Sequence, residues 1–277
     1  AASASWSSRV ADSTLTAYRY LLGAQVRSQS QYRASFAADV VGSLMFGVLD
    51  VASVFVVFRV TPTLGGFAFA EVFLMTALAG CAFAMADLAV GNVERLRQYV
   101  RSGLLDALLV RPLSALAQLA AMDVATRRVG RVAFGVIMVA VAAAHAPVPL
   151  TPARLALLLV TPVAGGMIFG AVFVASATVA FWWVESGEVA NGLTYGGLNF
   201  TQYPITIYGT LFRRLFAYAV GFAFVAYYPT LTLLDRADPL GAPAFLGYTS
   251  PAVGIVAVTP AGLTWRAGAR HYRSTGS

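Results

Sequence analysis

The 277-residue sequence contains no lysine, a single cysteine (Cys81) and two histidines (His145 and His271). The absence of lysine excludes a P-loop, a kinase-type ATP site and Schiff-base catalysis, because each of these uses a lysine amine. One cysteine excludes an intrachain disulfide and sites built from several cysteines, and two histidines are too few for a three-histidine zinc site. We therefore expect no catalytic residue, metal or cofactor in this chain.

Charge is also scarce, because only 11% of the residues are charged whereas 58% are hydrophobic. An ordinary soluble domain has about 25% charged and about 45–50% apolar residues. The net charge of +7 does not indicate a nucleic-acid partner, since the arginines lie between apolar runs and not on a soluble basic face. Composition therefore predicts an integral membrane protein, with the lipid bilayer as its solvent.

Six segments have roughly the 17–25 residues that a membrane-spanning helix requires. They are predicted at Ala34–Phe58, Phe67–Val90, Val129–Ala146, Leu155–Trp183, Leu215–Leu234 and Thr249–Trp265. The sequence thus predicts an all-α membrane protein in which residues 34–277 form a transmembrane domain of six helices.

Residues 1–33 are predicted to form a polar tail and an amphipathic helix, because Leu15, Tyr18, Leu22 and Val26 recur at helical spacing. Such a helix fits the membrane interface, although an ordinary packed amphipathic helix has the same periodicity.

The arginines are distributed very unequally along this layout. With the N-terminus inside, sixteen of the nineteen arginines fall in cytoplasmic segments, and Arg59, Arg154 and Arg236 lie outside. Because basic residues concentrate on the cytoplasmic side of membrane proteins, both termini are predicted to be cytoplasmic. An odd number of spans would place one basic end outside.

Residues 91–128 form the longest predicted cytoplasmic connection. Apolar residues recur there at helical spacing, and Pro112 is expected to end the helix because proline disfavours the α conformation in the preceding residue. This pattern predicts one amphipathic helix over Glu94–Leu109, whose apolar stripe is Val93, Leu96, Val100, Leu104 and Leu108. Such a helix is what a cytoplasmic motor would push, but a helix lying on the membrane surface has the same pattern.

Three acidic residues, Asp50, Glu71 and Asp87, fall inside predicted spans. A carboxylate at the centre of a membrane helix costs roughly 2.5–3.5 kcal/mol and requires a partner, water or a proton. Asp87 is near the cytoplasmic end and is expected to pair with Arg127, Arg128 or Arg131. Asp50 and Glu71 have only Arg59 nearby, so they are expected to line a polar pathway, to meet across a subunit interface or to bond between helices.

The segment SGLLDALLVRPLS, residues 102–114, resembles the cytoplasmic-loop signature of permease subunits of bacterial ABC exporters of the type-2 class. FWWVESGE, QYPITIYGTLFRRLF and the C-terminal WRAGARHYRSTGS resemble later stretches of a six-span subgroup of these permeases. The resemblance covers nearly the whole chain.

What this resemblance implies goes beyond composition and spacing. It implies a permease of the bacterial inner membrane that pairs with an identical or sister permease and binds two copies of a separate ATPase, which holds ATP and Mg²⁺. The 91–128 loop would contact that ATPase through Glu94, Arg95, Arg97, Arg101, Gly103, Asp106, Arg111 and Pro112. It also implies re-entrant helices on the outer side, at Asp235–Tyr248.

Three other classes remain as alternatives. An autonomous proton-coupled secondary transporter would use the intramembrane acids, but the chain has no clear internal repeat of the kind such transporters often show. An intramembrane enzyme is disfavoured by the residue inventory, and an importer permease by the lack of its cytoplasmic loop pattern. The sequence does not reveal the cargo.

Overall fold

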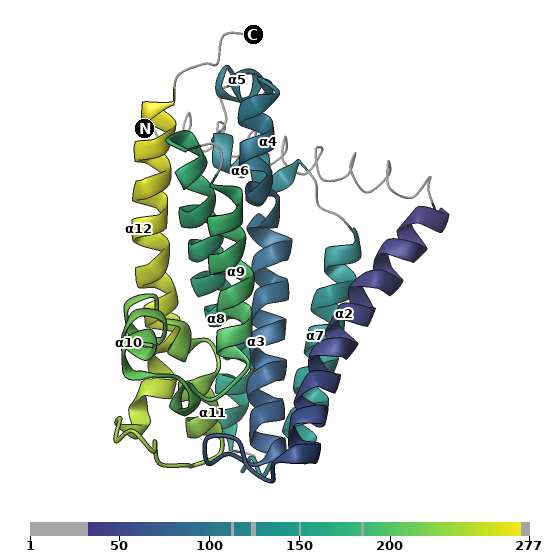
Figure 1. Ribbon diagram of the computed structural model, residues 1–277, viewed down its shortest axis with the longest axis vertical. Helices are drawn as coiled ribbons and strands as arrows, with labels where there is room; N and C mark the ends of the chain where they lie inside the picture. Colours follow the sequence, from purple (N-terminus) through teal and green to yellow (C-terminus); the bar gives the residue numbers. More distant parts are fainter. Residues whose placement is uncertain (1–32, 112–113, 123–125, 150, 184–185, 273–277) are drawn as a thin grey trace, which may run out of the picture.

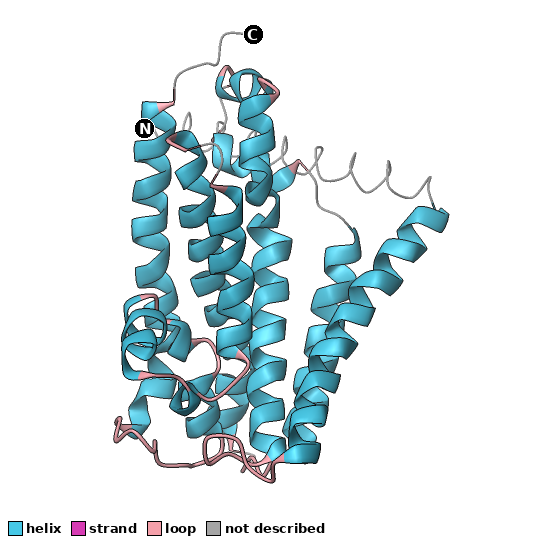
Figure 2. Ribbon diagram, in the orientation of Figure 1, coloured by secondary structure: helices cyan, strands magenta, loops and turns pink. Residues whose placement is uncertain are grey.

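The computed structural model describes residues 33–111, 114–122, 126–149, 151–183 and 186–272. The tail and interfacial helix predicted within residues 1–33 therefore lie almost wholly outside the described part of the chain. Within the described residues, helices and their connecting loops make up the fold and no strand is formed (Figure 2). The predicted all-α class is confirmed.

Long helices run side by side along the longest axis of the molecule (Figure 1). They are α2 (Arg33–Val60), α3 (Phe69–Val90), α7 (Thr126–His145), α8 (Pro152–Thr178) and α12 (Ser250–His271). They correspond to the first four predicted spans and the sixth, with ends shifted by a few residues. One end of the bundle carries Arg128, Arg131, Arg266 and Arg270, and we call it the arginine-rich end; the opposite end is the arginine-poor end.

Helix α3 forms the centre of the bundle, because α2, α7 and α8 all pack against it. Most of its residues between Val72 and Asp87 are buried. Glycines let neighbouring backbones approach it closely: a Cβ on Gly135 of α7 would lie 2.9 Å from the Cα of Cys81. Small residues have this use in membrane helices, where van der Waals packing drives association.

Among the described residues, four helical runs are long and apolar enough to cross a membrane: Phe69–Arg101, Arg128–His145, Pro152–Phe181 and Ala244–His271. Helix α2 has 28 residues, which also exceeds the roughly 20 residues that a crossing requires. The bent pair Thr210–Ala219 and Phe222–Leu233 is either a broken span or a re-entrant loop. The number of crossings, expected to be six, stays a prediction.

Helix α9 (Gly187–Thr201) is a feature that the sequence does not predict. It starts at the arginine-rich end, where a Cβ on Gly187 would lie 2.6 Å from the Nη1 atom of Arg97. The chain then passes through η3 (Ile205–Ile207). There the Thr206 hydroxyl donates a 3.0 Å hydrogen bond to the carbonyl of Gly65, in the loop between α2 and α3. Helix α9 and η3 together therefore run from the arginine-rich end to the arginine-poor end.

The next segment does not form the continuous span predicted at Leu215–Leu234. It consists of α10 (Thr210–Phe212), the π-helical η4 (Arg213–Ala219), η5 (Phe222–Phe224) and α11 (Tyr227–Leu233). Its two halves are bent by 67°, and at the bend Gly221 has a φ of 88°, which glycine adopts without the steric cost of a Cβ.

Both ends of this segment lie at the arginine-poor end. Thr206 contacts Gly65 before it, and Arg236 donates to the carbonyl of Gly66 after it. A segment that enters and leaves on one side is a re-entrant pair and not a span, so the prediction for Leu215–Leu234 is wrong.

Two further expectations change as a consequence. Arg213 and Arg214 are two of the sixteen arginines that the predicted layout places on the cytoplasmic side. They belong to η4, which directly follows α10 in the lower half of the view, away from α4 and the arginine-rich end (Figure 1). The re-entrant helices implied at Asp235–Tyr248 occur instead at 210–233, and the expected stretch holds turns and the short η6 (Ala244–Thr249).

Candidate functional site

Beyond α3 the chain continues through η1 (Gly91–Arg95), α4 (Leu96–Arg101), α5 (Leu104–Leu109) and α6 (Ala115–Ala121). We call this part, residues 91–121, the extension. Helix α4 continues the direction of α3 and α5 forms the tip, beyond the arginine-rich end of the bundle (Figure 1). Helix α3 has 22 residues and is therefore about 33 Å long, which covers the roughly 30 Å hydrocarbon core. The extension therefore lies beyond the membrane-spanning part.

The single amphipathic helix predicted over Glu94–Leu109 is broken in the structure. Gly103 has a φ of 70° and separates α4 from α5, and glycine is the residue that adopts this conformation at no steric cost. The break changes which face of the chain is covered. Leu105 is buried and Leu104, predicted on the buried stripe, is 38% exposed.

Apolar packing ties the extension to the bundle. One buried cluster joins Val93, Leu96 and Val100 of the extension to Val174 of α8 and Trp265 of α12. Because protein interiors are close-packed, displacement of one member is transmitted to the others. A force on the extension is therefore transmitted to two long helices.

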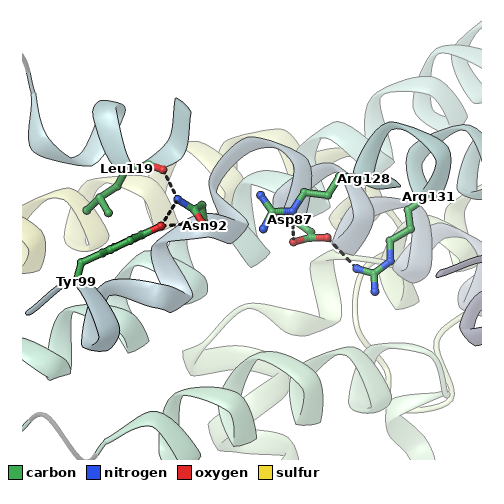
Figure 3. A network of polar contacts seen from close by, with 6 residues as sticks. All are labelled: Asp87, Asn92, Tyr99, Leu119, Arg128 and Arg131. Atoms are coloured by element: carbon green, nitrogen blue, oxygen red, sulfur yellow. Dashed lines mark hydrogen bonds and ion pairs between the residues drawn. The ribbon is translucent and has the colours of Figure 1, made fainter. Parts of the chain in front are cut away.

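A buried amide fixes the shape of the extension (Figure 3). Asn92 is fully buried, and its Nδ2 donates a 2.7 Å hydrogen bond to the carbonyl of Leu119 and a 3.2 Å bond to the hydroxyl of Tyr99. Gln118 donates a 3.1 Å hydrogen bond to the carbonyl of Leu108. These bonds join η1, α4, α5 and α6 into one unit.

A charge network lies where the extension leaves the bundle (Figure 3). The Asp87 carboxylate pairs with Arg128 at 3.2 Å and with Arg131 at 2.8 Å. Both arginines belong to α7, so the network ties the end of α3 to the start of α7. The pairing predicted for Asp87 is thereby confirmed.

Glu94 lies in the turn after α3, outside the spanning part. Its Oε1 atom is buried and has no hydrogen-bond partner. Burial raises the pKa of the Glu94 carboxyl to about 7, and the negative charge of Asp87 adds to this shift. A hydrogen bond from the Thr194 side chain of α9 and the positive charge of Arg128 lower this pKa in part. Glu94 therefore holds or loses a proton near neutral pH.

The other residues predicted to contact an ATPase are spread over the extension. Arg95, Arg101 and Arg111 are exposed. Arg97 lies against Gly187 of α9. Asp106 interacts with Tyr272, directly after α12. Burial is the main cause of the raised pKa of the Tyr272 hydroxyl, and Asp106 raises that pKa further. Pro112 falls outside the described residues.

The tip also exposes apolar side chains, of which only Leu104 belongs to the predicted apolar stripe. Leu109 is 42% exposed and Val110 is 86% exposed. With Leu104 they form what we call the tip patch.

The second notable feature is a cavity of about 430 Å³ between α2, α3, α7 and α9. Its polar lining comes from Asp50, Thr76, Arg131, Asn199 and Gln202. Asp50 thus lines a largely apolar cavity that contains a few polar groups, and its role in a pathway stays a prediction. Asn199 and Gln202 were missed in the sequence because they belong to the unpredicted α9 and the turn after it.

Glu71 lies elsewhere, at the arginine-poor end, where it pairs with Arg236 and accepts a 2.7 Å hydrogen bond from the backbone N–H of Ala68. The structure therefore separates the three intramembrane acids into three environments. Among the described residues, no three His, Cys, Asp or Glu side chains form a group that would hold a metal ion.

Fold and site together define a multi-pass helical membrane protein with a packed extension beyond one membrane face. Comparison with protein families gives a match to the ABC-2 family transporter proteins over residues 44–276, and the chain belongs to this family. It is therefore a membrane permease component of an ABC transporter, as its sequence resemblance predicts. Comparisons with curated proteins and with solved structures find no match.

Proposed function

We propose that this chain is the permease subunit of an ABC exporter of the bacterial inner membrane, driven by a separate ATPase that binds the extension. Two ATPase copies hold ATP and Mg²⁺, and this chain supplies no catalytic residue. The resemblance to type-2 exporters supports pairing with an identical or sister permease, which completes the translocation pathway.

The tip patch is the observation that carries this proposal. Leu104, Leu109 and Val110 are exposed at the far end of the extension, whereas most other large apolar residues of η1, α4 and α5 are buried. The patch lies beyond the membrane-spanning helices (Figure 1), where lipid does not cover it. Large apolar side chains that are exposed where lipid does not cover them are typical of a protein-binding surface.

The connections of the extension explain how such binding would drive transport. Its apolar cluster joins it to α8 and α12, and Asp87 joins the end of α3 to α7. Movement of a bound ATPase would therefore reach four of the long helices. A helix lying flat on the membrane surface, the other expectation for this segment, would not continue the direction of α3.

The test is co-purification of the ATPase with the full chain. Leu109→Asp with Val110→Asp places two charges in the tip patch, and an unpaired charge buried in an interface is costly. We expect at least a tenfold loss of retained ATPase and loss of ATP-driven transport. The matched control, Leu109→Met with Val110→Ile, keeps the surface apolar and should retain the ATPase. Wild-type retention in the Asp variant would contradict the proposal.

A proton-coupled secondary transporter is the competing function, because Asp50 is an intramembrane acid that lines a cavity. Transport in inverted vesicles separates the two. We expect uptake that requires ATP and persists when an uncoupler removes the proton gradient. Uptake that follows the gradient, with no ATPase attached to the unmodified chain, would favour the secondary transporter.

A further inference from the structure

The cavity between α2, α3, α7 and α9 has properties of a binding site that the family assignment does not specify. Its volume of about 430 Å³ falls within the roughly 300–1,000 Å³ of small-molecule sites. Its walls combine aromatic rings, from Phe83, Phe134 and Tyr195, with a few polar groups. Such walls suit a molecule with a large apolar body and few polar atoms.

The charges of the cavity are not balanced. Arg131 lines it, but its guanidinium is paired with Asp87 at 2.8 Å. Asp50 also lines it, and among the described residues no arginine forms an ion pair with its carboxylate. A carboxylate at membrane depth requires a compensating partner. Asp50 is therefore the acid of the cavity without an ion-pair partner, although the Gln202 side chain and the positive charge of Arg131 both stabilise its carboxylate.

A second group, the Gln202 amide beside Asp50, also points to a ligand. Gln202 is only 2% exposed, and its Nε2 atom is buried without a hydrogen-bond partner of normal geometry. The neighbouring Thr76 hydroxyl does not serve it, because that hydroxyl bonds to the carbonyls of Val72 and Gln202. A buried amide donor left unpaired costs about 1–3 kcal/mol. An acceptor atom on a bound molecule would remove this cost.

We propose that this cavity binds a protonated amphiphilic amine, with its ammonium against Asp50, an acceptor oxygen against Gln202 and its apolar body against Phe83 and Phe134. Amines of this kind are then the substrate class of the exporter, an assignment that rests on the proposed function. A site for amphiphilic anions would need a free cation in the cavity, and Arg131 is already paired.

Binding is tested with a fluorescent pair that shares one apolar body and differs at the amine, which is charged in one compound and acetylated in the other. Dansylcadaverine carries a primary amine, and its N-acetyl derivative has the same apolar body without the positive charge. The full chain in nanodiscs of zwitterionic lipid is titrated with each compound. We expect at least tenfold tighter binding of the amine. Equal affinity for the two compounds, or tighter binding of the anion 1-anilinonaphthalene-8-sulfonate, would overturn the proposal without the need for any variant.

Variants then locate the site. Asp50→Asn should weaken binding of the amine at least tenfold and leave the acetylated compound unchanged, and Asp50→Glu should restore part of the affinity. Gln202→Leu should weaken both compounds several-fold. Glu188→Gln is the matched control, because this acid is exposed on α9 and does not line the cavity, and it should change neither. Unchanged amine binding in a folded Asp50→Asn variant would overturn the proposal.

Hydrolysis by the attached ATPase separates this inference from the function on which it rests. Dansylcadaverine should stimulate hydrolysis by the intact complex, and the acetylated compound should not. Binding through Asp50 without stimulation would overturn the substrate assignment. An ATPase that never attaches would instead overturn the proposed function and leave the binding result standing.

Discussion

Arg236, in the turn after α11, forms an ion pair with Glu71 in the first turn of α3, 165 residues earlier in the chain. The same guanidinium lies 4.1 Å from the centre of the Phe67 ring and donates to the carbonyl of Gly66. A carboxylate is favoured at a helix N-terminus, so Glu71 is stabilised both by its helix and by its partner. This contact fixes the exit of the re-entrant pair to the central helix of the bundle.

Arg236→Gln is therefore expected to destabilise the protein. It removes a charged partner from Glu71, which is mostly buried, and hydrogen bonds to charged groups contribute about 1.5–3 kcal/mol. Thermal unfolding of the purified chain in detergent, followed by circular dichroism, measures the loss. Arg59→Gln is the control at the same end, because Arg59 is exposed and a surface change of this kind stays within about 0.5 kcal/mol. Equal losses in the two variants would contradict a specific role for the Arg236–Glu71 pair.

Asn92→Ala should loosen the extension. The Leu119 carbonyl and the Tyr99 hydroxyl would lose a buried donor, which costs about 1–3 kcal/mol. Because α6 is held through Leu119, we expect faster proteolytic cleavage within residues 91–121 and weaker ATPase retention. Asn191→Ala, on an exposed position of α9, should leave both unchanged. Wild-type protease resistance of the Asn92 variant would show that the amide does not hold α6.

Glu94 predicts a dependence of stability on pH. Its folded-state pKa is about 7, above the roughly 4.3 of a free glutamate, so the folded state binds the extra proton. Stability therefore falls as pH rises from about 4.3 towards 7 and is constant above that range. Glu94→Gln should remove this part of the slope between pH 5.5 and 8, as measured by thermal unfolding. Glu188→Gln, at an exposed position of α9, should leave the slope unchanged.

Sequence patterns predict the long helices well, because α2, α3, α7, α8 and α12 each contain an apolar run of membrane length. The Asp87 network is also predictable. The chain leaves the bundle after Asp87 and re-enters it at the same end, and Arg128 and Arg131 lie at the start of the returning helix. Both features depend on composition and on short-range order along the chain. They need no knowledge of how distant segments pack.

Helix α9 could not be predicted in this way. It has 15 residues and contains Gly187, Gly192, Gly196 and Gly197, a composition that favours loops when read locally. The reason for at least one glycine is tertiary: a Cβ on Gly197 would overlap the ring of Phe222 from the re-entrant pair. Because α9 is not predicted, the fifth span is predicted at Leu215–Leu234 instead. For the same reason the sequence does not indicate Asn199 and Gln202 as cavity residues.

Long-range pairs and backbone conformation were unpredictable for the same reason. Nothing near Glu71 in sequence indicates Arg236 as its partner. The apolar spacing of the extension fits one continuous helix, and only the left-handed conformation of Gly103 reverses which of Leu104 and Leu105 is buried. Within the tip patch it is Leu104 whose exposure depends on that backbone conformation, whereas Leu109 and Val110 lie off the predicted apolar stripe.

Gly103→Ala should therefore impair ATPase binding. A left-handed backbone costs a residue with a Cβ about 1–2 kcal/mol, which favours rebuilding the tip as a continuous helix. We expect lower ATPase retention with little change in the unfolding temperature of the bundle, because α5 packs beyond the long helices. Gly192→Ala is the control, since a Cβ there meets nothing within 4 Å. Full ATPase retention in Gly103→Ala would show that the left-handed conformation at residue 103 is not required for ATPase binding.

The topology of the region after α9 can be tested with one cysteine. If Leu215–Leu234 were a continuous fifth span, residue 209 would lie on the cytoplasmic side; in the re-entrant arrangement it lies on the outer side, three residues after the Thr206–Gly65 contact. Gly209 is exposed, and a Cβ there meets nothing within 4 Å, so Gly209→Cys should fold normally.

We expect an impermeant maleimide to label Gly209→Cys in intact cells, as we expect it to label Thr63→Cys in the loop between α2 and α3. Gln98→Cys on α4 should react only after the membrane is permeabilised, and the native Cys81 should not react because it is fully buried. Labelling of Gly209→Cys only after permeabilisation would restore the continuous span and remove the re-entrant pair, because residue 209 and α4 would then lie on the same side of the membrane.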